Sequence, residues 1–228
     1  MLAIAPGCGS DLAGGTTQDI CTVPVNDDQT VRQAPCARSD LLDHLRNAIE
    51  ERGAATLHTK KSSKQVEEWG ESVRSRFSGG TTADADMVLG RDGIHSSIRN
   101  RFIVDTPVFS RQITYRGVIP TDALTDWPFE TDSLAWLVKY RHVLALPITR
   151  NIHLNIVAFV TKSAAEGAEV KERWTSICDR RDVLGDLAGF DEPAPQGLNL
   201  LPEQPSKWSL NGREPLDRRH YMGGKVSC

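Results

Sequence analysis

The sequence predicts an α+β protein in which a small α/β part is followed by an antiparallel sheet. An amphipathic helix and several short strands follow residue 35. The middle third then holds three long runs of β-branched and aromatic residues, and these runs are joined by short turns. A chain of 228 residues is long enough to bury one sizeable core or two smaller ones.

Composition excludes several classes of function. The chain has 27 basic and 30 acidic residues, a net charge of −3, which argues against a general nucleic-acid or acidic-membrane binder. No apolar run approaches the roughly 18 residues of a membrane helix, and the first residues lack the basic region of a signal peptide. We therefore expect a soluble, cytoplasmic protein with neither membrane nor nucleic acid among its partners.

The cysteines indicate reduced thiols. There are five of them, widely scattered, with no Cys-x-x-Cys pair and no histidine at ligand spacing. We expect no metal site.

The clearest local signal is a helix over residues 38–53. Ser39 is suited to the N-cap, Gly53 is suited to the end, and an apolar face is formed by Leu41, Leu42, Leu45 and Ile49. Further helices are expected around Val170, Trp174 and Ile177, and around Val183, Leu184 and Leu187 with an end at Gly189.

Strands are predicted on both sides of residue 105. Short ones are expected at 55–59, 64–69, 71–77 and 87–89. Long ones are expected at 134–140, 142–146 and 152–160, with Pro147 and a turn at 149–151 between the last two. The proline-rich tail, residues 193–224, leads to the start of another strand at Gly224-Lys-Val226.

The most informative segment, residues 85–99, reads as a strand, a glycine turn and the start of a helix. Gly90 and Gly93 permit a positive φ and a close approach of the backbone to a ligand, and Ser96 and Ser97 can cap the helix, whose free N–H groups attract a phosphate. Asp92 is placed to accept hydrogen bonds from sugar hydroxyls or from backbone amides. On spacing alone, an ordinary turn with Asp92 as a turn residue is the favoured alternative.

This segment, Asp86-Met-Val-Leu-Gly-Arg-Asp-Gly-Ile-His-Ser-Ser-Ile-Arg99, resembles the DG motif of the FAD-dependent aromatic hydroxylases, in their salicylate-hydroxylase-like fungal branch. Other segments are similar to that family in the same order: Arg38-Ser-Asp-Leu-Leu, Tyr115-Arg-Gly-Val-Ile-Pro120, Leu154-Asn-Ile-Val-Ala-Phe159 and Tyr221-Met-Gly-Gly-Lys-Val226. The resemblance runs from about residue 36 onward.

The resemblance implies a division into four parts. These are an irregular segment (1–34), a partial FAD/NAD(P)-binding domain (35–105), an antiparallel substrate domain (106–205) and a return towards the FAD domain (206–228). We expect a chain truncated at both FAD-anchoring ends. The Gly-rich turn at the start of the family is only faintly matched by Gly7-Cys-Gly-Ser-Asp-Leu12, and the family's second FAD motif would begin where Cys228 stands.

The resemblance also implies roles for individual residues. Arg38, Asp92 and Gly93 would contact FAD, and Arg116 would orient a phenolate, since a guanidinium suits a planar anion. The alternative for Arg38 is a solvated arginine before a helix. For Arg116 the equally weighted alternative is a strand arginine paired with a surface carboxylate.

The function implied is that of a FAD-dependent monooxygenase that uses NAD(P)H and O2 to hydroxylate a small aromatic, phenol- or salicylate-like or polyketide-derived. One alternative is an inactive or incomplete remnant of such an enzyme that acts by binding. Another is that a second copy or a partner chain completes the site.

Overall fold

The computed structural model describes residues 2–4, 36–124, 133–168, 176–190 and 194–228. Contacts divide the chain into two compact units. The large unit contains residues 1–49 and 111–210, and the small unit contains residues 50–110 and 211–228. Most of the segment 1–34, the predicted helical residues Val170 and Trp174, and Cys8 and Cys21 lie outside the described residues.

A seven-stranded sheet forms the large unit, in the order β1-β7-β8-β9-β6-β11-β10. Its strands are β1 (Leu2–Ile4), β6 (Val108–Pro120), β7 (Ser133–Val138), β8 (Arg141–Ile148), β9 (His153–Thr161), β10 (Ser176–Ile177) and β11 (Ser206–Gly212). Strands β6 to β9 pair antiparallel, as predicted, and β1 joins the edge parallel to β7.

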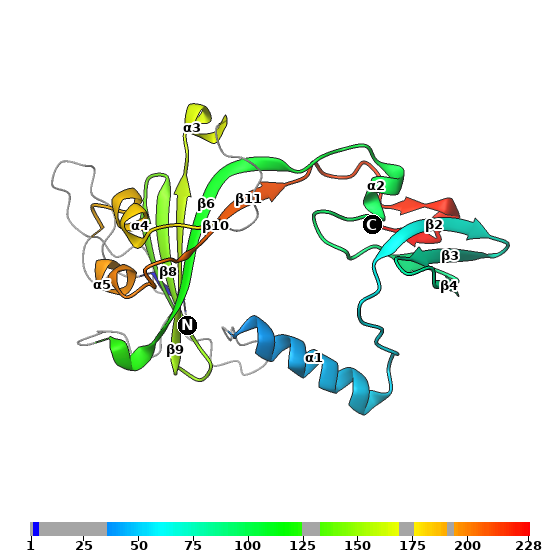
Figure 1. Cartoon of the computed structure of the whole chain (residues 1–228), viewed down its shortest axis with the longest axis horizontal. Coiled ribbons are helices and arrows are strands. Elements are labelled where there is room, and N and C mark those ends of the chain that lie inside the picture. The colour runs from blue at the N-terminus through cyan, green and yellow to red at the C-terminus, as the bar shows by residue number, and fades with distance from the viewer. Residues whose placement is uncertain (1, 5–35, 125–132, 169–175, 191–193) are drawn as a thin grey trace. The chain divides into compact units, whose positions relative to one another are not determined.

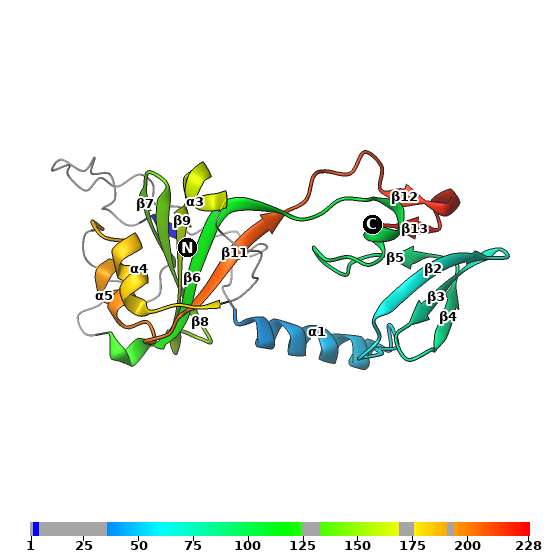
Figure 2. The ribbon, with the colours of Figure 1, turned by 45° about the horizontal axis from the view of Figure 1, so that its top comes forward.

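One face of this sheet carries the core of the large unit. Tyr115, Ile156, Ala145 and Leu134 share this face by register, and each is at most 1% exposed. Two short helices, α4 (Arg180–Asp186) and α5 (Ala194–Asn199), lie against the sheet in Figures 1 and 2. They and the loops around them supply the buried Val183, Leu187, Phe190, Leu198 and Leu201.

The opposite face carries Arg116, Val118, Asn155 and Val157, because Arg116 pairs with Val157 and Val118 pairs with Asn155. The remaining helical pieces of the large unit are η1 (Thr121–Ala123) and α3 (Ala164–Ala168).

Gly117 is the point where the segment after α5 comes closest to the sheet. A Cβ built there would collide with the Leu201 side chain and would lie 3.2 Å from Pro202 Cδ. We predict that Gly117→Ala will lower the free energy of unfolding by about 1–3 kcal/mol through overpacking. Gly185→Ala in α4, where a Cβ meets nothing within 4 Å, is the matched control. Urea unfolding of both variants tests this, and equal midpoints would contradict it.

The small unit contains two three-stranded sheets. One is a meander of β2 (Ser63–Trp69), β3 (Ser72–Phe77) and β4 (Thr82–Ala85). Its strand β3 buries Val73 and Ser75 and turns Arg74 and Arg76 the other way, as the alternation predicted. Salt bridges from Arg74 to Asp84 and from Arg76 to Glu67 lie on the outer face.

The second sheet brings distant parts of the chain together. It has the order β12 (His220–Tyr221), β13 (Val226–Ser227) and β5 (Val88–Leu89), and β13 runs parallel to β5. A turn, η2 (Met222–Gly224), joins β12 to β13, and a short helix, α2 (Arg99–Phe102), follows β5. The hydrophobic core of the small unit lies between residues of both sheets and the segment before α2, and it consists of Val66, Val73, Ile98, Tyr221 and Val226.

Helix α1 (Arg38–Arg52) confirms the strongest prediction and corrects its start. Gly53 ends the helix at a φ of +57°. Because the helix begins at Arg38, Ser39 lies inside the first turn and is not the N-cap. The apolar face is unburied within the described chain: the exposed fractions of Leu41, Leu42 and Leu45 are 47%, 49% and 50%.

Three other predictions were wrong. Residues 55–59 form no strand, since each is exposed and none pairs with another strand. Ile177 lies in β10, where it pairs with Ser206, and not in a helix. Pro147 lies inside β8 and does not separate two strands. It is tolerated there because the pairing with β7 has ended at Ala145. The turn at 149–151 is confirmed, with a positive φ at each residue.

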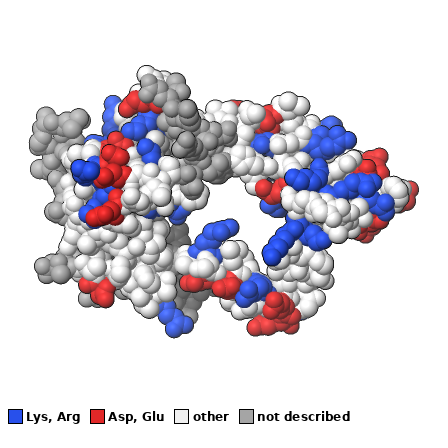
Figure 3. All heavy atoms as spheres, viewed as in Figure 1, with Lys and Arg blue, Asp and Glu red and all other residues white. Residues whose placement is uncertain are grey.

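In the described parts of the chain, no helix is long and apolar enough to cross a membrane. Figure 3 shows acidic and basic side chains close together over the face it presents, in keeping with the nearly balanced charge.

Candidate functional site

The glycine bend of the small unit follows directly from β5. Gly90 donates its N–H to Ser227 O at 2.7 Å, and a Cβ there would lie 3.0 Å from the Ile98 side chain, so this glycine is needed for packing. Gly93 differs: its φ is +81°, and a Cβ would meet no atom within 4 Å. The backbone at Gly93 is therefore open to a ligand. The predicted strand leading into the bend is present as β5, which pairs parallel with β13.

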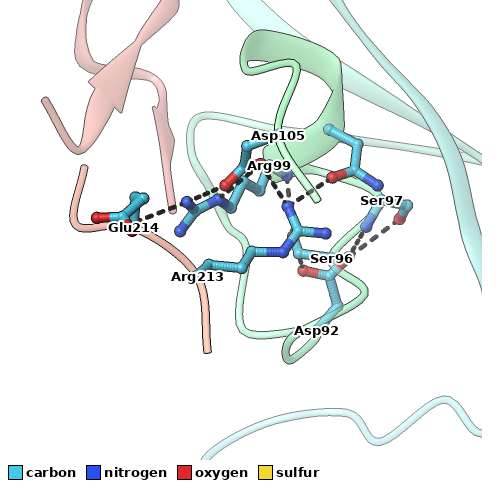
Figure 4. A network of polar contacts seen from close by, with 8 residues as sticks. Asp92, Ser96, Ser97, Arg99, Asp105, Arg213 and Glu214 are labelled. Atoms are coloured by element: carbon cyan, nitrogen blue, oxygen red, sulfur yellow. Dashed lines mark hydrogen bonds and ion pairs between the residues drawn. The ribbon is translucent and has the colours of Figure 1, made fainter. Parts of the chain in front are cut away.

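Asp92 binds its own chain (Figure 4). Its carboxylate accepts hydrogen bonds from the Ser96 hydroxyl, from the N–H and hydroxyl of Ser97 at 2.8 and 3.0 Å, and from the N–H of Ile98 at 3.3 Å. Ser96 Oγ in turn accepts from Arg99 N at 2.9 Å. Of the two kinds of donor proposed for Asp92, sugar hydroxyls and backbone amides, the fold supplies the backbone amides.

These contacts determine the charge state of Asp92. Partial burial raises the pKa of the carboxyl, but the hydrogen bonds from Ser96, Ile98 and Ser97 outweigh it, so the pKa lies below its usual value. The carboxylate is ionised at neutral pH, and its hydrogen bonds hold the bend against Ser97 and Ile98, which lead into α2.

We predict that Asp92→Ala will destabilise the small unit by about 1–3 kcal/mol, because the N–H groups of Ser97 and Ile98 lose their common acceptor. Asp86→Ala, an exposed aspartate beside β5, is the control. Hydrogen exchange of the amides of Ser97 and Ile98 measures the effect locally. Similar protection in both variants would show that the hydrogen bonds to Asp92 do not stabilise the small unit.

A second polar network fixes α2 to residues 213–214 (Figure 4). Arg213 Nη1 donates to Asn100 Oδ1 at 2.8 Å and to Asp105 Oδ1 at 2.7 Å, and Arg99 Nη2 donates to Glu214 O at 2.9 Å. The Arg213 side chain is only 6% exposed. Hydrogen bonds from Arg99 and the charge of Arg213 keep the pKa of Asp105 below its usual value. This network stabilises the unit that carries the bend.

The large unit contains a cavity of about 670 Å³ on the sheet face that carries Arg116. The β strands contribute Arg116, Gly117, Val118, Ile148, Asn155, Ser206 and Trp208. The start of α1 contributes Cys36, Ala37, Arg38 and Leu41, and the segment before β11 contributes Pro202, Gln204 and Pro205.

The charge of this cavity is positive. Among the described residues that line it, Arg38 and Arg116 are the charged ones, and none is a carboxylate. Neither guanidinium forms a hydrogen bond or ion pair with any described residue. The alternative of Arg116 paired with a surface carboxylate therefore finds no support among the described residues. Two guanidinium groups that no described residue pairs with, beside apolar walls and the Trp208 indole, suit a flat anionic ligand.

The sequence-predicted residues thus fall into two groups. Arg38 and Arg116 line one cavity in the large unit, whereas Asp92 and Gly93 form the bend of the small unit. Asn155 and Trp208 also line the cavity, and neither was predicted from the sequence as a site residue. Asn155 had a detectable signal, since it is the polar residue in the otherwise apolar run 154–158.

A buried polar cluster lies on the opposite, core face of the sheet. Tyr115, at 1% exposure, donates its hydroxyl to Asp186 Oδ2 at 2.6 Å, and Lys162 Nζ donates to the same carboxylate at 3.0 Å. Burial raises the pKa of Asp186, but the hydrogen bonds from Tyr115 and Lys162 outweigh it and the net shift is downward. Burial, and then the bond to Asp186, raises the pKa of Tyr115, so that it remains a donor.

No family model matches the chain. It is 31% identical over 211 residues to 6-methylsalicylate 1-monooxygenase of Aspergillus terreus, covering 87% of this chain and 44% of that one. It is 28% identical over 200 residues to a FAD-dependent monooxygenase of Monascus ruber, with coverages of 84% and 45%. Among solved structures, a salicylate hydroxylase in a substrate complex superimposes with a TM-score of 0.70 and 26% identity, covering 83% of this chain and 49% of the other.

These similarities identify a class. The fold is that of the FAD-dependent hydroxylases, and it comprises an antiparallel sheet and part of a flavin-binding domain. By sequence and by fold, the chain is a homologue of the FAD-dependent aromatic hydroxylases of the salicylate-hydroxylase-like group. The chain spans about half the length of the curated relatives it matches.

Proposed function

We propose that this chain provides the substrate cavity and the glycine bend at Asp92 and Gly93 of a FAD-dependent monooxygenase. This enzyme would hydroxylate a small aromatic anion with NAD(P)H and O2. A phenol, a salicylate or a polyketide-derived ring fits the proposal. The observation that carries it is the cavity with Arg38 and Arg116, since two cations with no carboxylate among the described lining residues favour an anionic ligand.

The described residues fit FAD to different degrees. Arg38 has no partner among the described residues and can pair with a phosphate or with a flavin carbonyl, and Gly93 leaves its backbone accessible. Asp92 fits less well, because one of its oxygens already accepts three hydrogen bonds from Ser97 and Ile98. Its Oδ1, which accepts from Ser96, retains capacity for a further donor.

In this function FAD supplies the redox chemistry, and the chain supplies position and charge. Arg116 holds the anionic group of the ring and favours its ionised form. Val118, Ile148 and Pro202 contribute apolar walls that displace water from the ring. Arg38 contributes positive charge beside the same cavity.

A second function, ligand or partner binding without catalysis, is favoured by different observations. Most of the accepting capacity of Asp92 is used by its own chain, and α1 exposes about half of each of Leu41, Leu42 and Leu45. The cavity would then bind an aromatic anion, and the chain would act as a non-catalytic relative of the hydroxylases.

One experiment separates the two functions. Binding of FAD to the 228-residue chain is measured by flavin fluorescence, and binding of benzoate and of salicylate is measured by calorimetry. The oxidation of NADH and of NADPH is then measured with FAD and salicylate present. FAD binding with ring-dependent oxidation and a hydroxylated product supports the monooxygenase. Aromatic binding without FAD binding supports the non-catalytic function, and the absence of both contradicts both.

Arg38→Ala refines the FAD arm of this experiment. If Arg38 pairs with FAD, its loss weakens FAD binding by about 10-fold, the value of one charge-assisted hydrogen bond. Arg46→Ala on the outside of α1, where Arg46 pairs only with Asp43 in a surface ion pair, is the control. Equal FAD affinities in the two variants would remove Arg38 from the FAD site.

A further inference from the structure

Asn155 occupies an unusual position for an amide. It lies in β9 with Val118 opposite on β6 and Leu146 opposite on β8, so apolar residues lie on both sides of it in the sheet. Asparagine is depleted in strands, and a half-buried amide without a partner destabilises the fold. The packing of the sheet therefore does not account for its presence.

The amide of Asn155 faces the cavity that holds Arg116. Among the described residues, its side chain forms no hydrogen bond with the protein. An asparagine amide contains two N–H donors and one carbonyl acceptor, and all of them remain available for a ligand.

Asn155 and Arg116 lie in adjacent strands. Arg116 pairs with Val157, so Asn155 is the diagonal neighbour of Arg116 on the same face. Diagonal neighbours are separated by about 7–8 Å, and long side chains can reach across that interval. A single aromatic ring between the two side chains can present an anionic group to Arg116 and a second polar group to Asn155.

We infer that Asn155 is a specificity-determining residue that binds a hydroxyl or amino substituent on the ring, in addition to the anionic group held by Arg116. The inference rests on the proposed function, because it needs an aromatic anion in this cavity. It goes further by requiring a second hydrogen-bonding substituent and by assigning that substituent to one residue.

The test compares ligands that share a carboxylate and differ in one hydroxyl. Benzoate and its 2-, 3- and 4-hydroxy derivatives are titrated by calorimetry into the wild-type chain, Asn155→Leu and Asn155→Ser. Gln204→Leu is the matched control, because it also replaces an amide by an alkyl group at the same cavity, but from an exposed position before β11. Circular dichroism confirms that each variant is folded, and Asn155→Ser serves if leucine disrupts the sheet.

In the wild type we expect at least one hydroxybenzoate to bind about fivefold more tightly than benzoate, the value of one hydrogen bond. Asn155→Leu should abolish this preference while benzoate affinity stays within about twofold, and Gln204→Leu should retain it. Three outcomes would overturn the inference and leave the proposed function standing: no preference in the wild type, a preference that survives in Asn155→Leu, or a preference that disappears in Gln204→Leu. A wild type that binds none of the four acids would overturn the proposed function, and the inference with it.

Discussion

Replacing Arg116 by alanine will weaken the binding of benzoate or salicylate by about 10- to 50-fold, because a charge-assisted contact to a carboxylate is worth about 1.5–3 kcal/mol and Arg116 is partly open to water. The loss reflects charge and geometry together, so Arg116→Lys should recover only part of the affinity: an ammonium keeps the charge but lacks the planar fork. Calorimetric titration measures both variants.

The matched control for Arg116 is Arg111→Ala. Arg111 lies on the same strand, is exposed and is not among the residues that line the cavity. If loss of Arg111 weakens binding as much as loss of Arg116, the effect is one of general positive charge. Raising the salt concentration then distinguishes the two cases further, because a direct contact in the cavity is screened less than a remote exposed charge.

Replacing Asp186 by alanine will lower the free energy of unfolding by about 2–4 kcal/mol, since it leaves the buried Tyr115 hydroxyl and the Lys162 ammonium without their common acceptor. Arg141 donates to the backbone carbonyls of Asp186 and Ala188 at 3.1 and 2.8 Å, and Arg180 donates to the Leu201 carbonyl at 2.8 Å, so α4 retains other polar attachments. Asp182→Ala, an exposed aspartate on the same helix, should change stability by less than about 0.5 kcal/mol. Urea unfolding at pH 7 tests the pair of variants.

The pH dependence of this effect has a definite sign. The pKa of Asp186 is lower in the folded chain than in the unfolded one, so its contribution is present at pH values above the unfolded pKa, about 3.9. The contribution is lost as the pH falls from there through the folded pKa. The difference in stability between wild type and Asp186→Asn should therefore shrink below about pH 4. A constant difference down to pH 2.5 would show that Asp186 does not act through its charge.

The parts of the fold that the sequence predicted are those decided by local pattern. The alternation of Val73, Ser75 and Phe77 determined one strand, and Gly53 determined the end of α1. The secondary structure of the proline-rich tail was harder to predict from the sequence. Its helix α5 and strand β11 depend on packing against a sheet that lies far away in sequence, as the contact of Leu201 with Gly117 shows.

The candidate site was predictable in its residues but not in its arrangement. Arg38 and Arg116 were singled out by resemblance, yet only the fold shows that both line one cavity. Asp92 was placed correctly at a bend, but the sequence left open whether a ligand or the chain's own amides would satisfy its carboxylate. Asn155 was missed, because a single polar residue in an apolar run carries no motif.

The parallel pairing of β5 with β13 has a consequence for biosynthesis. Val88 and Val226 pair across more than half of the chain, and all strands of the large sheet except β1 are encoded between them. While the polypeptide is still being made on the ribosome, the strand at 88–89 has to wait, without its partner, until residue 226 has emerged. The small unit is therefore completed after the large one, and we expect the nascent chain to expose Val88 and Leu89 to chaperones until then.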